Sequence, residues 1–201
     1  MYPIILDINE RPALVIGAGN VGERKIDALL LSGADVTVIS EKCPESIRQY
    51  AESGKIILIE RSYQSGDCAG FFLVIGATDD VQTNETIFRE CQELGILVNI
   101  VDVPELCTFY VPALVKRGDF QIAVTTGGKS PALARTIRKE LEAQFGEEYG
   151  VFTEQIGNMR DDLKKQYQGN PEERQRAIEE MFSREYRNFR KVRKNSGKSV
   201  S

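Results

Sequence analysis

The sequence predicts an α/β fold, a Rossmann-like doubly wound parallel sheet followed by a β-hairpin and a small C-terminal helical domain. Apolar runs of strand length alternate with amphipathic segments of helical length through the first half of the 201 residues, which is typical of strand–helix–strand units. The first strand-like run, residues 12–16, leads into a Gly-x-Gly-x-x-Gly motif at residues 17–22. Past Asp102 the pattern changes to two β-like runs and then to charged helical sequence.

The glycine motif stands where a strand turns into a helix, which we expect over residues 23–31. Gly17 permits the tight turn, Gly19 lets the backbone approach a pyrophosphate, and Gly22 lets the helix pack closely on the strand. The helix N-terminus offers free N–H groups and a partial positive charge to the phosphates. The motif therefore predicts a dinucleotide site, and a merely structural strand-to-helix turn is the alternative.

The other elements of the predicted sheet follow in chain order. Residues 2–7 form a short strand or arm, and the fourth strand-like run is continuously apolar, as expected of a buried parallel strand. Gly33 and Gly95 suit left-handed conformations at helix ends. The expected strands span residues 12–16, 35–40, 55–60, 71–75 and 96–101, and the expected helices after the first span residues 44–53 and 81–94.

Polar residues follow the second and fourth predicted strands. Glu41 lies 19 residues beyond the last motif glycine, where an acid can bind the ribose hydroxyls of the adenosine. An acid there favours NAD over NADP because it repels a 2′-phosphate, although the adjacent Lys42 weakens this preference. Because the carboxyl ends of parallel strands face the ligand crevice, we expect Gly76, Thr78 and Asp79 to line the cofactor.

A hairpin and a second glycine-rich turn follow the predicted sheet. Residues 109–115 and 119–126 are β-like runs around a short turn, which predicts a β-hairpin. A hairpin that leaves the sheet must bury its apolar face against another part of the structure. A second subunit is the natural candidate, so we predict a homodimer. Ser130 and Pro131 suit the N-cap and first position of a helix over residues 132–145. The turn before that helix is a second candidate anion site, and a simple capped turn is the alternative.

The last stretch is helical and charged. Apolar residues recur on one helical face over residues 149–167, and Pro171 begins a second helix that continues the stripe. Residues 183–201 hold seven basic residues and one acid, although the whole chain has a net charge of −4. A solvated helix end, or a surface that faces a polyanionic small molecule, explains this better than a nucleic-acid tail, for which no motif is present. Beyond Asn195 we expect disorder.

Composition excludes several classes of chemistry. The chain has no histidine, so acid–base work must use Asp, Glu, Lys, Tyr or Cys. Its four cysteines form no Cys-x-x-Cys pair, so we expect free thiols rather than a metal site or a disulfide framework. No apolar run is long enough to span a bilayer. We expect a cytoplasmic protein with no membrane or nucleic-acid partner.

Several motifs together resemble one family. These are Asn-Ile-Val-Asp at 99–102, Phe-Tyr-Val-Pro-Ala at 109–113, the run from Thr-Thr-Gly-Gly-Lys-Ser-Pro to Arg at 125–135, and the two segments at 17–25 and 76–80. In combination they look like the precorrin-2 dehydrogenase family. That family includes the N-terminal part of the fused bacterial siroheme synthases and some bifunctional dehydrogenase–chelatases.

The resemblance implies NAD-dependent oxidation of precorrin-2 to sirohydrochlorin, on the route to siroheme. It also implies three parts: an NAD-binding domain over residues 1–111, a dimerisation segment over 112–145 and a helical domain over 146–201. The resemblance covers the first two parts well and the helical end more loosely. The chain stops where the fused enzymes continue into a methyltransferase domain.

The resemblance also assigns site residues. The catalytic aspartate of the family falls on Asp102, and its cofactor contacts fall on Asn20, Val21, Glu41 and Lys42. Oxidation of precorrin-2 removes a hydride and a proton. The cofactor takes the hydride, and a carboxylate at a strand end can accept the proton.

Precorrin-2 is an octacarboxylate tetrapyrrole, so its binding site needs cations and N–H groups. Some family members carry a phosphorylatable serine where this chain has Thr126. The basic C-terminal helix can contribute further cations. The predicted substrate contacts are Arg117, Thr126, Gly127, Gly128, Lys129 and Arg135.

Two alternatives remain at this stage. One is a bifunctional enzyme that also inserts iron into sirohydrochlorin, for which the lack of histidine leaves only carboxylates or the substrate itself to guide the metal. The other is a non-catalytic module that senses NAD. Such a module does not need the Asp102 segment or the second glycine-rich turn, and it would bind NAD without turning over a tetrapyrrole.

Overall fold

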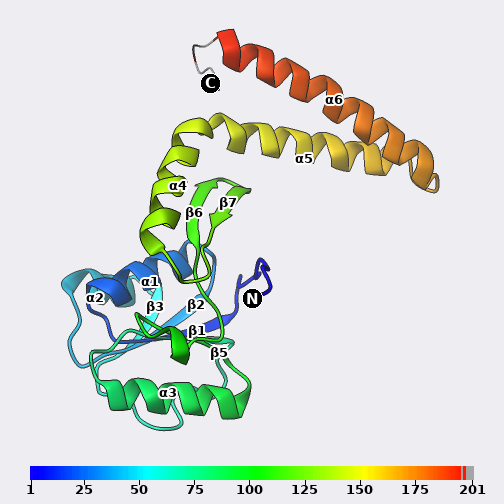
Figure 1. Ribbon diagram of the computed structural model, residues 1–201. Helices are drawn as coiled ribbons and strands as arrows, with labels where there is room; N and C mark the ends of the chain where they lie inside the picture. Colours follow the sequence, from blue (N-terminus) through cyan, green and yellow to red (C-terminus); the bar gives the residue numbers. More distant parts are fainter. Residues whose placement is uncertain (196, 198–201) are drawn as a thin grey trace. The chain divides into compact units, whose positions relative to one another are not determined.

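The structure is a computed structural model that describes residues 1–195 and Gly197 (Figure 1). The disorder predicted beyond Asn195 therefore concerns positions that lie, apart from Gly197, outside the described residues. The chain divides into two compact units, Met1–Val111 and Pro112–Ser201. The further division predicted at residue 145 stays a prediction.

The first unit is a five-stranded parallel sheet with helices on both faces, as the sequence predicted. The strands lie in the order β3-β2-β1-β4-β5, and Figure 1 shows α1 and α2 on one face of the sheet and α3 on the other. The strands are β1 (Pro12–Ile16), β2 (Asp35–Ile39), β3 (Ile56–Ile59), β4 (Leu73–Gly76) and β5 (Leu97–Ile100), and the helices are α1 (Asn20–Leu30), α2 (Glu45–Glu52), α3 (Val81–Leu94) and the short 3₁₀ turn η1 (Pro104–Leu106).

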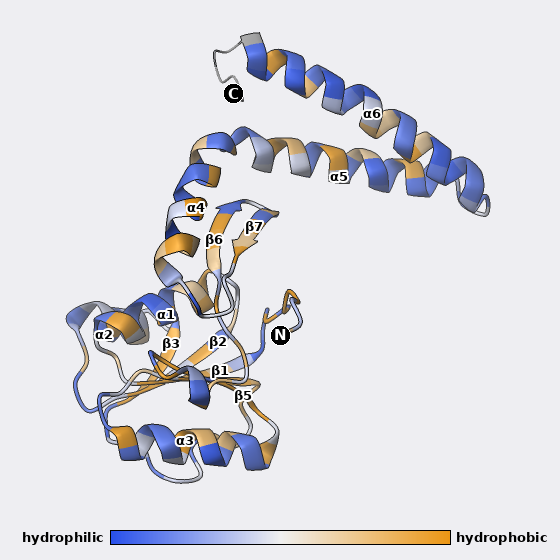
Figure 2. Cartoon of the chain, in the orientation of Figure 1, coloured by the Kyte–Doolittle hydropathy of each residue, from blue (hydrophilic) through white to orange (hydrophobic). Residues whose placement is uncertain are grey.

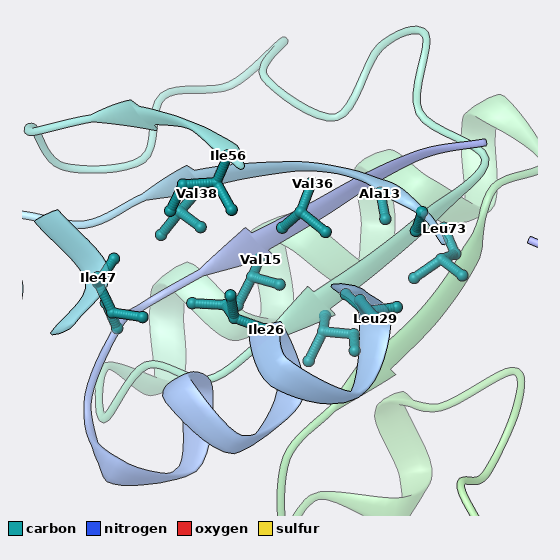
Figure 3. Packing of buried hydrophobic residues seen from close by; sticks show 12 residues of the cluster. Ala13, Val15, Ile26, Leu29, Val36, Val38, Ile47, Ile56 and Leu73 are labelled. Atoms are coloured by element: carbon teal, nitrogen blue, oxygen red, sulfur yellow. The ribbon is translucent and has the colours of Figure 1, made fainter. Parts of the chain in front are cut away.

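Alternate residues of each strand feed two separate hydrophobic clusters. In β1, Val15 packs in the cluster beneath α1 and α2 with Ile26 and Val38, as Figure 3 shows. Its neighbour Leu14 packs in the opposite cluster beneath α3, with Ile87 among others. Because both faces are covered, the strands are apolar at consecutive positions, and this explains why the sequence shows continuous runs rather than alternation.

Several boundaries in this unit differ from the prediction, and α1 begins at Asn20, inside the glycine motif, rather than at residue 23. Residues 2–7 form no strand, and Tyr2 and Ile5 are almost fully exposed. The fourth strand begins at Leu73, so Phe71 and Phe72 lie before it. Gly95 ends α3 in the left-handed conformation, with φ of 68°, as expected.

The second unit holds an antiparallel hairpin and three helices. These are β6 (Ala113–Arg117), β7 (Phe120–Val124), α4 (Pro131–Gln144), α5 (Glu148–Gln166) and α6 (Pro171–Asn195). Figure 2 shows hydrophilic and hydrophobic positions alternating along α5 and α6, as an amphipathic pair requires. Within the described residues, no helix is both long and apolar enough to cross a membrane.

The predicted hairpin boundaries are corrected by the structure. The strand begins at Ala113 rather than at residue 109, and the turn lies at Gly118. The residues before it belong to the first unit, where they follow the edge strand β5. The Thr108 amide donates to the Val98 carbonyl at 2.8 Å, and the Asn99 side-chain amide donates to the Phe109 carbonyl at 2.9 Å. These bonds to β5 take the place of a longer hairpin strand.

Aromatic rings hold the helices of the second unit together. Phe152 of α5 stacks on Phe189 of α6 with ring centroids 4.3 Å apart, and Tyr149 meets Phe189 edge-on. Arg193 is 9% exposed and closes the cluster from one end. Its guanidinium donates to the Gln144 carbonyl, the Glu148 carboxylate and the Tyr149 hydroxyl. The basic end of the chain is thus partly structural.

Candidate functional site

The order of the strands locates a crevice in the first unit. The chain runs outward from β1 through β2 to β3, then returns to place β4 on the other side of β1. The connections after β1 and β4 therefore leave in opposite directions, and ligands of open parallel sheets bind at such a point, beyond the carboxyl ends of the strands. The glycine motif follows β1, and residues 77–79 follow β4.

The three motif glycines have different surroundings. Gly17 has φ of 96°, and a Cβ added there would lie 2.4 Å from the Ala77 carbonyl oxygen. A Cβ on Gly22 would lie 2.0 Å from the Gly17 carbonyl oxygen. A Cβ on Gly19 would meet nothing within 4 Å. The first and third glycines are thus required by packing, whereas the second faces open space.

The N-terminus of α1 is free to bind an anion. Its N-cap is Gly19, and no side chain among the described residues caps the first amides of the helix, those of Asn20, Val21 and Gly22. In contrast, α3 is capped by Asp80, whose carboxylate accepts from the Thr83 amide at 2.8 Å. Open space at an uncapped helix N-terminus fits a pyrophosphate, so the residues present fit a dinucleotide.

Ser40, which the sequence reasoning missed, ties this loop to the end of β2. The Ala18 amide donates to the Ser40 hydroxyl oxygen at 3.1 Å, and that hydroxyl donates to the Lys42 carbonyl at 2.9 Å. Glu41 and Lys42 lie at the same sheet edge with exposed side chains, and the Ser62 hydroxyl donates to the Glu41 carboxylate. Their contacts with a cofactor stay predictions.

The residues after β4 are held by Asn84, which is 5% exposed and was also missed. The Thr78 hydroxyl donates to the Asn84 side-chain carbonyl at 2.8 Å, and the Asn84 amide donates back to the Thr78 carbonyl at 3.0 Å. Gly76 is buried, and a Cβ there would lie 2.5 Å from Ile100 Cδ1. Asp79 is exposed at the crevice. An asparagine four residues after the N-cap Asp80, on the apolar face of α3 with Ile87 and Cys91, could have signalled this arrangement.

Asp102 adopts an unusual backbone conformation just beyond β5. Its φ is 60°, in the left-handed region, and the Val103 amide donates to the Ile100 carbonyl across the turn. Asp102 stands at the third position of that turn, where a positive φ favours glycine. Aspartate tolerates this region better than most residues but not as well as glycine. The exposed Asp102 carboxylate is thus placed at the crevice edge by a strained turn.

Asp102 lines a pocket of about 430 Å³ between α1 and the end of β5. Lys25 lines it from the α1 side and is half-buried. Burial lowers the pKa of Lys25, and the nearby Arg24 lowers it further, while Asp102 and the Cys107 thiol act in the opposite direction. The sequence reasoning missed Lys25, although it lies one helical turn after Val21, a predicted cofactor contact.

The floor of this pocket is polar but contains no metal cluster. Asn99 is 8% exposed, and its side-chain amide approaches the Cys107 sulfur at 3.4 Å. Burial raises the pKa of the Cys107 thiol. All four cysteines are free, and the described residues contain no group of three His, Cys, Asp or Glu side chains that could hold a metal ion.

In the second unit, the glycine-rich turn before α4 is closed by its own side chains. The Thr126 hydroxyl oxygen accepts from the Ser130 amide at 3.0 Å, and Ser130 caps α4 by accepting from the Leu133 amide. The turn therefore has the capped form that the sequence left open as an alternative. Gly127 and Gly128 have positive φ, and Lys129 and Arg135 are exposed.

Arg117 lies at the other end of α4. Its guanidinium donates to the carbonyls of Phe145 and Glu142, at 3.0 and 3.4 Å, and its side chain is 15% exposed. The 14-residue helix places this end about 20 Å from the glycine-rich turn, at 1.5 Å per residue. The structure thus does not bring Arg117 together with Lys129, and we leave it out of the site proposed below.

Comparison with known families agrees with this geometry. Residues 4–113 match the family model described as "Putative NAD(P)-binding", which covers more than half of the chain. The chain belongs to this NAD(P)-binding family. Residues 117–144 match the model described as "Sirohaem biosynthesis protein central". The resemblance inferred from the motifs and the expectation of NAD(P) binding are thereby confirmed.

Within the NAD(P)-binding family, the chain is similar to siroheme synthases. It is 38% identical over 181 residues to the siroheme synthase of Vesicomyosocius okutanii, which is 90% of this chain and 39% of that protein. It is 35% identical over 182 residues to that of Mannheimia succiniciproducens, again 90% of this chain and 38% of the relative. The chain thus spans under two-fifths of the length of these relatives.

The fold also resembles a solved structure, that of SirC, a precorrin-2 dehydrogenase. The TM-score is 0.77, with 24% sequence identity, over 97% of this chain and 100% of that chain. At this level of identity the likeness concerns the fold. It includes the parallel sheet, the hairpin and the helical C-terminal part that the sequence predicted.

Proposed function

We propose that this protein is a precorrin-2 dehydrogenase that oxidises precorrin-2 to sirohydrochlorin with NAD⁺ as the hydride acceptor. The observation that carries the proposal is the place of Asp102. Its carboxylate stands at the carboxyl edge of the sheet and lines a pocket beside the uncapped N-terminus of α1. A proton acceptor next to a dinucleotide site is what a dehydrogenase of this kind needs.

Different residues of the chain bind the cofactor and accept the proton. The amides at the start of α1 bind the pyrophosphate, and Glu41 at the end of β2 accepts hydrogen bonds from the adenosine ribose. Bound NAD⁺ supplies the hydride acceptor. The Asp102 carboxylate accepts the proton that leaves the tetrapyrrole, and because its side chain is exposed it can release that proton to water. Precorrin-2 and NAD⁺ thus yield sirohydrochlorin, NADH and one proton.

In the second unit, we place the remaining substrate contacts on the glycine-rich turn. Lys129 and Arg135 are exposed cations within one or two turns of each other, at the start of α4. They suit carboxylates of an octacarboxylate substrate. Gly127 and Gly128 are exposed and have positive φ, and the Thr126 hydroxyl fixes the shape of the turn. The prediction that Thr126 and the two glycines contact the substrate remains part of this proposal.

The direct test is an anaerobic incubation of the purified protein with precorrin-2 and NAD⁺. We expect NADH and the sirohydrochlorin spectrum to appear together, in equal amounts. Binding of NAD⁺ without turnover of precorrin-2 would instead support the sensor module considered above. The same reaction with iron added and the product isolated would show whether the protein is bifunctional.

We also propose that the protein is a cytoplasmic homodimer. The hairpin has one covered face, where Val115 is fully buried, and one exposed face, where Leu114 is 40% exposed. A two-stranded sheet is marginal on its own, so a second copy that covers this face would stabilise it. Light scattering should give twice the chain mass of 22.5 kDa, and a monomer at micromolar concentration would contradict this.

The proposed cytoplasmic location agrees with the state of the cysteines. The four free thiols suit a reducing compartment.

A further inference from the structure

We propose that Lys25 binds a carboxylate group of the substrate, in the pocket between α1 and the end of β5, and so holds the tetrapyrrole beside Asp102. This inference rests on the proposed function, because it takes precorrin-2 as the substrate. It adds Lys25 to the proposed substrate contacts. Lys25 would be a binding and positioning residue, while Asp102 carries the proton chemistry.

The placement of Lys25 follows from the helix that carries it. Val21, Lys25 and Ala28 recur at helical spacing, so they share the face of α1 that lines the pocket. The opposite wall comes from the end of β5 and the turn that holds Asp102. Lys25 and Asp102 therefore border the same space from two elements, and a group bound there contacts both.

The charges in the pocket favour an anion. Three charged side chains line it, the cations Arg24 and Lys25 and the anion Asp102. The Lys25 ammonium forms neither a hydrogen bond nor an ion pair with the described residues, and the attraction of Asp102 only partly offsets the lowering of its pKa by burial and Arg24. A half-buried cation without a partner is costly. A carboxylate of the substrate supplies the missing partner.

The surroundings of Arg24 explain why Lys25 rather than Arg24 is the principal contact. Arg24 is exposed, and its Nε already donates to the Asn20 carbonyl at 3.3 Å. The Tyr110 hydroxyl donates to the Pro104 carbonyl, and the Asn99 amide donates to the Phe109 carbonyl. Arg24 keeps further N–H donors, but its side chain is exposed to solvent, whereas Lys25 is half-buried in the pocket wall and therefore gains more from a bound carboxylate.

The test compares three variants. Lys25→Met keeps the length and apolar stem of the side chain and removes its charge, whereas Lys25→Arg keeps the charge. Lys55→Met is the matched control, because Lys55 is an exposed lysine just before β3, at the opposite edge of the sheet. For each variant we would measure kcat and KM for precorrin-2, the Kd for NAD⁺ and the Tm.

A charge-assisted hydrogen bond is worth roughly 10- to 100-fold in affinity. Lys25→Met should therefore raise the KM for precorrin-2 by at least tenfold and change kcat by less than threefold. The Kd for NAD⁺ and the Tm should stay unchanged, which separates a substrate contact from a structural role. Lys25→Arg should recover most of the KM, and Lys55→Met should match the wild type.

A second measurement does not depend on turnover. Sirohydrochlorin carries the same carboxylates as precorrin-2, and its binding can be followed by absorbance without a reaction. If the wild type fails to oxidise precorrin-2, the proposed function is wrong, whereas weaker sirohydrochlorin binding by Lys25→Met would still support a carboxylate contact at Lys25. Unchanged tetrapyrrole binding by Lys25→Met, or no binding by the wild type, would overturn the inference. A weakened NAD⁺ Kd in Lys25→Met would assign Lys25 to the cofactor and overturn it too.

Discussion

The unit Met1–Val111 buries two aliphatic clusters on the two faces of one sheet, whereas the unit from Pro112 onward buries few aliphatic side chains. The second unit instead stacks aromatic rings and closes them with a buried arginine. Its hairpin also leaves Leu114 exposed. The difference teaches that the first unit can hold a precise site by itself, while the second depends on polar contacts and, we propose, on a second copy.

The largest expected effect comes from Asp102, in the well-packed unit. Asp102→Asn retains the shape and tolerates the left-handed turn, but an amide does not accept the proton. We expect turnover of precorrin-2 to fall roughly 10²- to 10⁴-fold, the usual contribution of a general base. The Kd for NAD⁺, measured by calorimetry, should not change.

Asp102→Gly separates chemistry from folding at the same position. Glycine adopts a φ of 60° without strain, so this variant should be as stable as the wild type or more so, by up to about 1 kcal/mol. It should nevertheless lose activity as Asp102→Asn does. If both variants turned over within threefold of the wild type, Asp102 would be a structural residue.

The motif glycines test how tightly the first unit is packed. Gly22→Ala places a Cβ against the Gly17 carbonyl, so we expect a loss of about 1–3 kcal/mol in stability. Gly19→Ala has room for its methyl group and a φ of −69°, so the Tm should hold while NAD⁺ binds at least tenfold more weakly. Thermal unfolding and calorimetry check both, and equal effects at the two positions would contradict the different roles assigned to them.

Arg193 tests the second unit. Arg193→Met removes three hydrogen bonds from a buried site, and we expect a loss of about 2 kcal/mol in the stability of that unit. Amide hydrogen exchange should become faster in α5 and α6 and stay slow in β1. The Kd for NAD⁺ should not change. Lys191→Met, at an exposed position of the same helix, is the control. Uniform quickening along the chain would show that the two units unfold together.

The smallest expected effect concerns the choice of cofactor. Glu41 should repel a 2′-phosphate, so NAD should be used at least tenfold better than NADP, which corresponds to about 1.4 kcal/mol. Glu41→Gln should lower the ratio of kcat/KM for NAD to kcat/KM for NADP. Equal kcat/KM values for the two cofactors in the wild type would show that Glu41 does not contact the ribose.

Much of the first unit could be predicted because its determinants are local. The continuous apolar runs, the glycine motif and the Gly95 cap each act within a few residues, and the strands and helices they indicate are present. The hairpin boundary could not be predicted in this way. Residues 107–109 follow β5 through hydrogen bonds to residues about ten positions earlier, and the β-like sequence alone does not distinguish that pairing from a longer hairpin strand.

The site was predictable in its backbone and less so in its side chains. The motif placed Gly17, Gly19 and Gly22 at the sheet edge, as the structure does. Lys25 was missed because a lysine on an amphipathic helix is expected to be exposed to solvent. Only the three-dimensional fold shows that β5 ends opposite it. Arg117 was expected at the substrate because of its charge, but its guanidinium binds the carbonyls of Phe145 and Glu142, which lie 28 and 25 residues away.

The open N-terminus of α1 has a practical consequence for how this protein is handled. A helix end that fits a pyrophosphate also fits inorganic phosphate and sulfate. Such buffer anions would compete with the dinucleotide and would stabilise the cofactor-free protein in proportion to their occupancy. Affinities for NAD⁺ measured in phosphate buffer would therefore be too weak, and melting temperatures too high, compared with those measured in a buffer of bulky, weakly binding ions.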